Sequence, residues 1–441
     1  MLPGIDWVLI IFYFILILVI GLFSSRKEDS QGFLVGNRQI GTASINATVS
    51  ASLTGGSAIA FYIALLYLWG FSAFWIFIGA SIGLLIFIPF AVRVKREGDM
   101  KKHLTLLDFM YSKFGRKSTT IAACLFLIVF SLLILSEMII GGKIFSVVTG
   151  LSYGLSVIVC SLIIFIYIYL GGVKSDIKTD IFQYAVFFFL LIIGFNLTKT
   201  TPLNTLEFDF FSMGAGQIIA AVLLGIIALF VSADVWQKIY TAKSEHSVKR
   251  GFFYAAISFF IVTFLITIIG LIIKANFPNA DPNAAMILGF SSLPSGLLGL
   301  GIVVILAATM STIDTALIVS SLFISRDIIS KYNSVSEEKL VKLTKLFVFA
   351  IWFVTTSIAI FTANLVYVFY NSFSLILILA PAVLFSFFFS LKQRAIMWSL
   401  ILGIISAILM AFSGNLTADY MVVPFFVSLI ALGIAQKLFK K

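Results

Sequence analysis

Thirteen long apolar segments, separated by short gaps, run through almost the whole chain and constrain its fold more than any other feature. They lie near residues 5–24, 42–70, 72–92, 118–147, 152–170, 179–198, 215–237, 251–273, 290–325, 346–362, 364–390, 395–413 and 421–436. Most contain the roughly 20 apolar residues that a helix needs to cross a bilayer. The sequence therefore predicts an all-α polytopic membrane protein with about 13 transmembrane helices.

The basic residues alternate with these segments. Of the 30 Lys and Arg residues, 27 follow an odd-numbered segment, and Lys238, directly after the seventh, is one of them. Lys143 lies inside the fourth segment instead. The positive-inside rule then predicts a multi-pass protein of the plasma (inner) membrane, with the N-terminus outside and the C-terminus in the cytoplasm. Arg26 and Lys27 follow the first segment, which is the reverse of a secretory signal, so we expect a retained helix.

Composition excludes several classes of protein. A chain with 61% hydrophobic and 11% charged residues does not fit a soluble domain. The net charge of +11 is spread over short loops, which favours contact with anionic lipid and no binding of nucleic acid. Cys124 and Cys160 both lie in predicted helices, so neither a disulfide framework nor a metal cluster is expected. His103 and His246 lie outside the apolar segments, so a buried nucleophile would lack a histidine base, and we predict that the chain is not an enzyme.

No gap is long enough for a soluble domain, so residues 1–441 are expected to form a single transmembrane transporter domain. Transporters often contain two repeats of opposite orientation. We assign a first five-helix repeat to 42–198 and a second, inverted repeat to 215–390. Residues 1–41 then hold a peripheral first helix and loop, and 395–441 two peripheral C-terminal helices.

The first helices of these two repeats carry small or polar interruptions. One is the run from Ser50 to Ser57, which includes two glycines, and the other is the run from Ser232 to Asp234. Helices broken at corresponding places indicate a binding site near the bilayer midplane. The alternative is that these small residues only allow close helix packing.

The ninth segment offers hydroxyl oxygens on one helical face. At about 100° per residue, Ala308, Ser311, Thr312 and Thr315 share that face. A hard cation such as sodium prefers oxygen ligands, and carbonyls of an unwound stretch around Ala51 and Thr54 could complete its shell. Hydroxyls on a membrane helix also often bond a carbonyl of their own helix, which is the alternative to an ion site.

Five ionisable residues lie within or at the mouth of the predicted bilayer: Glu137, Lys143, Asp180, Asp234 and Asp314. Buried charges are costly, so such residues usually face a cavity or a partner. Asp314 could support the ion shell from one side. For Lys143 the alternatives are solute contact and extension to the outer interface. Asp180 opens the sixth segment, where an acidic residue also suits a helix N-terminus.

Several motifs in register resemble the sodium/solute symporter family, over roughly residues 5–390. They are the opening IDWVLIIFYFILILVIGLFSSRK, then GFLVGNRQIG and SASLTGG, the run GGVKSDIKTDIFQ at 171–183, and AATMSTIDTALIVSSLFISRD from Ala307. The Ser311-Thr312 pair is most similar to the proline/sodium symporter-like branch. This resemblance implies a LeuT-type inverted-repeat fold with thirteen helices.

The resemblance also implies a sodium site. Its carbonyl ligands would be Ala51, Thr54 and Ala308, and its side-chain ligands Ser311 and Thr312. Asp180 would lie on the ion path, and from its position beside Ser311 on the helix we place Asp314 there as well. The solute would bind between segments 2, 4, 7 and 11, where we expect contacts from Ser52, Gly55, Gly56, Ser57, Glu137, Lys143, Ser232 and Asp234.

Two departures from the family pattern matter. Leu53 replaces an acidic residue of the proline branch, which puts proline itself in doubt as the solute. Lys178 replaces a tryptophan near Asp180, which leaves the detailed role of this aspartate open. The mixture of charges in the expected cavity indicates a polar or zwitterionic solute.

The predicted function is therefore secondary active import of a small polar organic solute, such as an amino acid or a sugar. Sodium is the expected coupling ion, and the solute, sodium and lipid are the expected partners. A proton-coupled transporter of the same fold, with Asp180, Asp234 or Asp314 as the proton carrier, is the first alternative. A solute-binding membrane sensor is the second, and an ion channel is disfavoured because broken helices in inverted blocks fit alternating access better.

Overall fold

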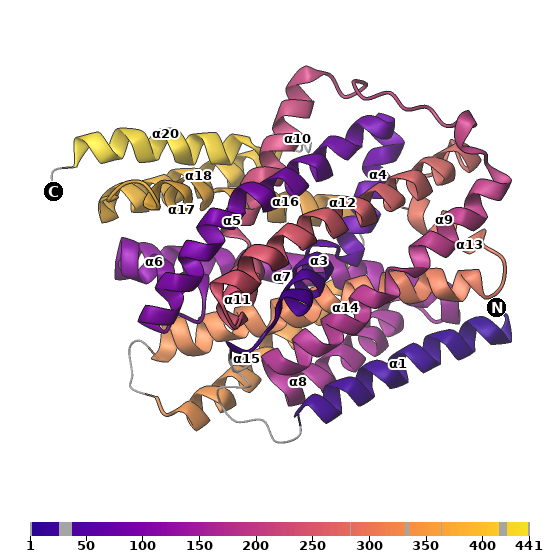
Figure 1. Cartoon of the computed structure of the whole chain (residues 1–441), viewed down its shortest axis with the longest axis horizontal. Helices are drawn as coiled ribbons and strands as arrows, with labels where there is room; N and C mark the ends of the chain where they lie inside the picture. Colours follow the sequence, from indigo (N-terminus) through magenta and orange to yellow (C-terminus); the bar gives the residue numbers. More distant parts are fainter. Residues whose placement is uncertain are drawn as a thin grey trace.

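The regular elements of this protein are helices. The structure, a computed structural model, describes residues 2–25, 38–282, 284–330, 335–362, 364–413 and 421–439. Within these ranges the helices pack into one bundle, and the single pairing of extended backbone is a parallel bridge between Ile40 and Ala242 (Figure 1). The predicted all-α class is confirmed. Arg26, Lys27 and the lysines at 440 and 441 lie outside the described residues.

Ten of the described helical stretches are long and apolar enough to cross a membrane, and a bent pair makes eleven. The count of thirteen stays a prediction, because the stretch Gly56–Lys101 contains two helices and Val423–Leu438 is shorter than a full span. The helices that surround the site are α1 (Gly4–Ser25), α5 (Trp75–Lys101), α7 (Arg116–Thr149), α8 (Tyr153–Val186), α12 (Glu245–Asn276), α14 (Leu297–Leu322), α15 (Glu337–Ala359) and α16 (Leu365–Leu377).

Helix α14 forms the centre of the bundle. Of the apolar stretch of this helix that could span a membrane, 94% is buried inside the protein, against 28% for α1 and 22% for α15. It contacts α7, α8, α1 and α15, and Figure 1 places it among α3, α7 and α8. An amphipathic surface helix would show one polar face, whereas α14 is apolar on nearly all sides, as a helix surrounded by others must be. Its few polar side chains therefore meet other helices.

Two helices are interrupted near this centre. The second apolar segment forms α3 (Thr42–Leu53) and α4 (Gly56–Trp69), with Thr54 and Gly55 between them in non-helical conformations. The seventh forms α10 (Ala215–Ala228) and α11 (Ala233–Thr241), which meet at an angle of 49°. Both interruptions fall where the sequence predicts them.

The ends of the interrupted helices are joined to each other. The Ile40 N–H, just before α3, donates to the Thr241 carbonyl at the end of α11 over 3.1 Å. The Lys243 N–H donates back to the Ile40 carbonyl over 2.9 Å. These two bonds form the isolated bridge, which we call the α3–α11 staple. It connects residues 201 and 203 positions apart in the chain.

Small residues let α5 and α10 approach closely. A Cβ atom on Gly79 would lie 2.5 Å from the Val222 carbonyl oxygen, and one on Gly225 would lie 2.4 Å from the Ala80 nitrogen. Close backbone approach of this kind is a frequent source of stability between membrane helices. Farther along the chain, α18 (Gln393–Ser413) and α20 (Val423–Leu438) pack together at one edge of the bundle (Figure 1).

Candidate ion and solute site

The break between α3 and α4 leaves the helical carbonyls at the end of α3 partly free. The Thr54 N–H donates to the Ala51 carbonyl over 3.1 Å, and the Thr54 hydroxyl donates to the Ser50 carbonyl over 2.8 Å. Carbonyl groups at the C-terminal end of a helix carry partial negative charge and attract cations. Ala51 and Thr54 thus lie at a helix end that suits a cation.

The hydroxyl face of α14 lies against this break. A Cβ atom on Gly55 would lie 2.5 Å from Thr312 Oγ1, so the two elements are in direct contact. Thr312 itself donates weakly to the Ala308 carbonyl over 3.3 Å, and Ser311 is fully buried. The predicted carbonyl and hydroxyl groups therefore come from two elements that meet, and oxygen groups of these kinds are sodium ligands.

A buried cluster of charges lies directly beside Ser311. Its hydroxyl donates to Asp180 Oδ1 over 2.5 Å. Oxygens of Asp176, Asp180 and Asp314 all lie within 4.8 Å of one another. The Lys238 ammonium, on α11, donates to Asp176 over 2.5 Å and to Asp180 over 2.8 Å. We call these four residues the acidic cluster.

Thr315 ties α14 into the acidic cluster. Its hydroxyl donates to Asp176 Oδ1 over 2.6 Å and accepts from the Lys238 ammonium over 3.3 Å. The backbone N–H of Thr315 donates to Asp314 Oδ1 over 2.7 Å. Charged hydrogen bonds of this kind are the strong ones, so α8, α11 and α14 are held together at one point.

Two members of the acidic cluster were not predicted. Lys238 falls one residue after the seventh apolar segment, where the sequence predicts a loop residue, yet its side chain is 1% exposed. Asp176 lies four residues before Asp180 on the same face of α8, and that spacing is the signal that could have found it. Asp180 lies inside α8 and not at a helix N-terminus, because the kink at Gly172 falls eight residues earlier.

A cavity of about 120 Å³ adjoins the break. Its lining includes six of the residues predicted for the solute site, together with Thr312 of the ion site: Ser52, Gly55, Ser57, Glu137, Ser232 and Asp234. Gly56 and Lys143 are not part of this lining. Gly56 faces Thr309 of α14, and Lys143 is half-buried on α7. We call this space the polar cavity.

Glu137 of α7 binds the first turn of α4. The Ser57 N–H donates to Glu137 Oε2 over 2.9 Å, and the Ser57 hydroxyl donates to Oε1 over 2.6 Å. The carboxylate thus caps the N-terminal end of α4, where unpaired N–H groups and the helix dipole favour negative charge. Gly55 makes room for it, since a Cβ atom there would lie 2.4 Å from Glu137 Oε1.

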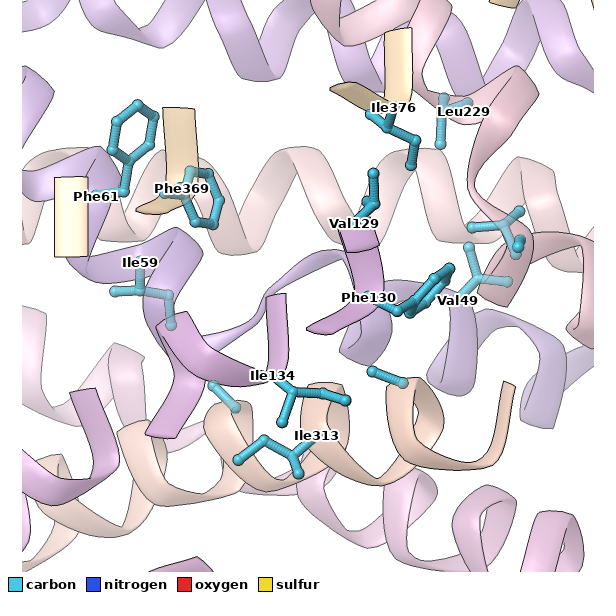
Figure 2. Close-up of a cluster of buried hydrophobic side chains, with 14 of the residues drawn as sticks. Val49, Ile59, Phe61, Val129, Phe130, Ile134, Leu229, Ile313, Phe369 and Ile376 are labelled. Carbon is cyan, nitrogen blue, oxygen red and sulfur yellow. The ribbon is translucent and has the colours of Figure 1, made fainter. Parts of the chain in front are cut away.

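A second, apolar cavity of about 140 Å³ adjoins the first. The two share Leu53, Ala58, Ser232, Phe369 and Phe373 among their lining residues. The ring of Phe61 stacks on that of Phe369 with centroids 4.6 Å apart, and Figure 2 shows the pair beside each other. Figure 2 also shows Phe130 and Ile376, which line the polar cavity, among these apolar side chains.

The chain resembles known transporters over most of its length. The profile of the Sodium:solute symporter family matches residues 33–204 and 209–403. Sodium/proline symporter 2 of Staphylococcus saprophyticus is 26% identical over 352 residues, which are 73% of this chain and 68% of that protein. The sodium/proline symporter of Staphylococcus aureus strain JH9 is also 26% identical, over 42% of this chain and 38% of that protein.

A solved structure shares the whole fold. It is a Na⁺-coupled sialic acid symporter in a substrate-bound, outward-open state, and it superposes with a TM-score of 0.82. The match covers 99% of this chain and 98% of that one at 19% identity, so it shows the fold alone. The interrupted helices, the oxygen-rich contact between them and α14, and the matched profile agree with one another. The chain belongs to the sodium:solute symporter family.

Proposed function

We propose that this protein is a sodium-coupled symporter that moves a small organic solute across the membrane by alternating access. The observation that carries the proposal is the contact between the α3–α4 break and the hydroxyl face of α14. Thr312 belongs to that contact and also lines the polar cavity. A cation bound there would touch the wall of the solute cavity, so each ligand can stabilise the site of the other.

The proposed sodium ligands are the carbonyls of Ala51, Thr54 and Ala308 and the hydroxyls of Ser311 and Thr312. Sodium would hold α3 against α14 and favour the outward-open state of the transporter. Solute in the polar cavity would then favour closure of the outer gate. Since coupling is a difference in affinity between states, sodium and solute must raise the affinity for each other by the same factor.

The test is thermal stabilisation of the purified protein by sodium, compared with potassium and lithium at constant ionic strength. A ligand that binds only the folded state raises apparent stability. We expect sodium to raise the Tm of the wild type and to lose most of this effect in Thr312→Ala. Thr355→Ala is the matched control, because that buried hydroxyl donates to its own helix at Ile351 over 2.7 Å. Equal stabilisation by sodium and potassium would reject the proposal.

The acidic cluster supports a second candidate, proton coupling. Three buried carboxylates around one ammonium could exchange a proton during transport. Solute uptake into proteoliposomes then depends on a pH gradient and proceeds without sodium. Uptake that requires sodium at equal internal and external pH excludes this candidate.

We further infer that the repeats at 42–198 and 215–390 have opposite orientation and that the N-terminus lies outside. The two interruptions support this arrangement, because each falls in the first helix of its repeat. The peripheral segments 1–41 and 395–441 would then lie outside the moving core.

A further inference from the structure

The ionisable side chains that line the polar cavity are all acidic. Glu137 and Asp234 are its acidic side chains, and among the described residues of the lining none is Lys, Arg or His. Asp234 lies at the first turn of α11 and is partly exposed to the cavity. A solute that enters this space meets two carboxylates and no cationic side chain.

The helix ends beside the cavity cannot readily supply positive charge to a solute. Interrupted helices in transporters often bind an anionic solute group at a half-helix N-terminus. Here that end of α4 is already bound to Glu137, through the Ser57 N–H at 2.9 Å and the Ser57 hydroxyl at 2.6 Å. The first turn of α11 contains Asp234. Both half-helices thus present a carboxylate of the protein where an anion would bind.

The two lysines nearest to the cavity do not contribute a positive charge to its lining. Lys238 is on α11, but its ammonium donates to Asp176 and Asp180 and is buried with them. The acidic cluster holds three acidic side chains and that one ammonium, so Lys238 is already paired and has no unpaired charge to offer a solute. Lys143 does not line the cavity. A solute carboxylate would therefore lose its hydration without gaining a cationic side chain as a partner, which is costly.

The aromatic residues in the rest of the cavity lining suit an organic cation. Phe130, Phe369 and Phe373 line the polar cavity, and the faces of aromatic rings attract ammonium groups. Beyond Phe369 the cavity continues into the apolar one, lined by Phe61, Tyr62 and other apolar side chains. A solute with a cationic head and an apolar body would place each part against matching groups.

We propose that the transported solute is an organic cation, a primary amine or a quaternary ammonium compound with an apolar body. Glu137 and Asp234 are its counter-charges. This inference rests on the proposed function, and it replaces the polar or zwitterionic solute expected from the sequence.

The test compares probes that differ in charge and share one body. Phenethylamine is the cation, phenylalanine the zwitterion, 3-phenylpropionate the anion and 3-phenyl-1-propanol the neutral form. Choline and its neutral isostere 3,3-dimethyl-1-butanol form a second, smaller set. Each is added to the purified protein in saturating sodium at constant ionic strength, and the Tm is measured over a range of concentrations. We expect stabilisation by phenethylamine, choline or both, and none by their matched partners.

Two variants connect the effect to the carboxylates. Asp234→Asn and Glu137→Gln should each weaken the apparent affinity for the stabilising cation by about tenfold or more, since each removes a charged partner. Glu338→Gln, an exposed acidic residue at the start of α15, is the matched control. Stabilisation by sodium alone shows that each variant is folded. If Glu137→Gln does not fold, Asp234→Asn carries the test.

The outcomes separate this inference from the proposed function. No stabilisation of the wild type by sodium would reject sodium coupling. Normal stabilisation by sodium, with the zwitterion or the anion stabilising more than the matched cation, would overturn the cationic solute alone. Failure of both cations to stabilise the sodium-loaded protein would overturn it as well, and so would cation affinity that is unchanged in Asp234→Asn and Glu137→Gln.

Discussion

Gly55 lies where three functional elements meet, and no larger residue fits there. A Cβ atom at this position would lie 2.4 Å from Glu137 and 2.5 Å from Thr312. The first belongs to the cap of α4 and the second to the candidate ion site. A side chain at this position would therefore clash with both Glu137 and Thr312, so only glycine fits.

We predict that Gly55→Ala lowers the stability of the protein and weakens its response to sodium. Overpacking typically costs about 1–3 kcal/mol, and here it would also displace Thr312. The measurement is the Tm with and without sodium. Gly216→Ala is the control, because a Cβ atom there meets nothing within 4 Å. An unchanged sodium response in Gly55→Ala would contradict the described contact.

Lys238 is the one ammonium in a cluster with three carboxylates, and it makes ion pairs at 2.5 and 2.8 Å. Removing one partner of a buried ion pair leaves the others uncompensated. Replacing partners on both sides is far less costly, because the charges that remain are closer to balance.

We predict that Lys238→Met lowers the free energy of unfolding by about 3–5 kcal/mol. Adding Asp176→Asn to this variant should recover part of the loss, since it removes one of the carboxylates left without the ammonium. Exposed Lys339→Met should have little effect. Thermal unfolding of the four proteins in detergent measures the difference. A double variant less stable than Lys238→Met would contradict the described cluster.

At the scale of elements, the interruptions of both broken helices could be predicted, because small and polar residues gather at corresponding places in the first helices of the two repeats. The acidic cluster could be predicted only in part. Asp180 and Asp314 stand inside apolar segments, but Lys238 lies at a segment end, where a lysine usually marks a loop. Its burial follows from the bend before α11, which places this short helix against α14, where the Lys238 ammonium reaches Asp176 and Asp180 of α8.

The turn between α5 and α6 (Leu106–Phe114) also depends on a buried group. His103 follows Lys102, which has a left-handed backbone conformation with φ of 56°, and its side chain is 6% exposed. Burial lowers the pKa of His103, an effect that the nearby Asp108 carboxylate opposes and Lys101 adds to. The folded protein therefore favours the neutral ring.

This pKa shift predicts a loss of stability in acid. A group with a lower pKa in the folded state binds fewer protons there, so its contribution falls as pH drops below the unfolded value of about 6.5. Between about pH 7.5 and 5.5, His103→Gln should lose less Tm than the wild type. His246→Gln, which changes an exposed histidine, should match the wild type. Equal pH dependence in all three would contradict the shift.

At the scale of the whole molecule, the alternation of basic loops predicts which face lies in the cytoplasm. The described loops on opposite faces include exposed positions suitable for labelling. Glu207 lies in the loop after α9 (Phe189–Thr200), and Glu338 lies at the start of α15.

In a variant without Cys124 and Cys160, a membrane-impermeant maleimide added to intact cells should label Glu207→Cys and leave Glu338→Cys unlabelled. The reverse is not expected, because it would place most of the basic loops outside. Permeabilised cells, in which both positions should react, provide the control. Labelling of Glu338→Cys alone in intact cells would invert the proposed orientation.

The α3–α11 staple has a mechanical consequence. It joins the helix that ends in the Ala51 and Thr54 carbonyls to the helix that begins at Asp234. If a solute binds at Asp234 as proposed, a displacement of α11 is transmitted through these two backbone hydrogen bonds to α3, which carries the proposed ion ligands Ala51 and Thr54. The two half-helices would then move together, and release of the solute would favour release of the ion.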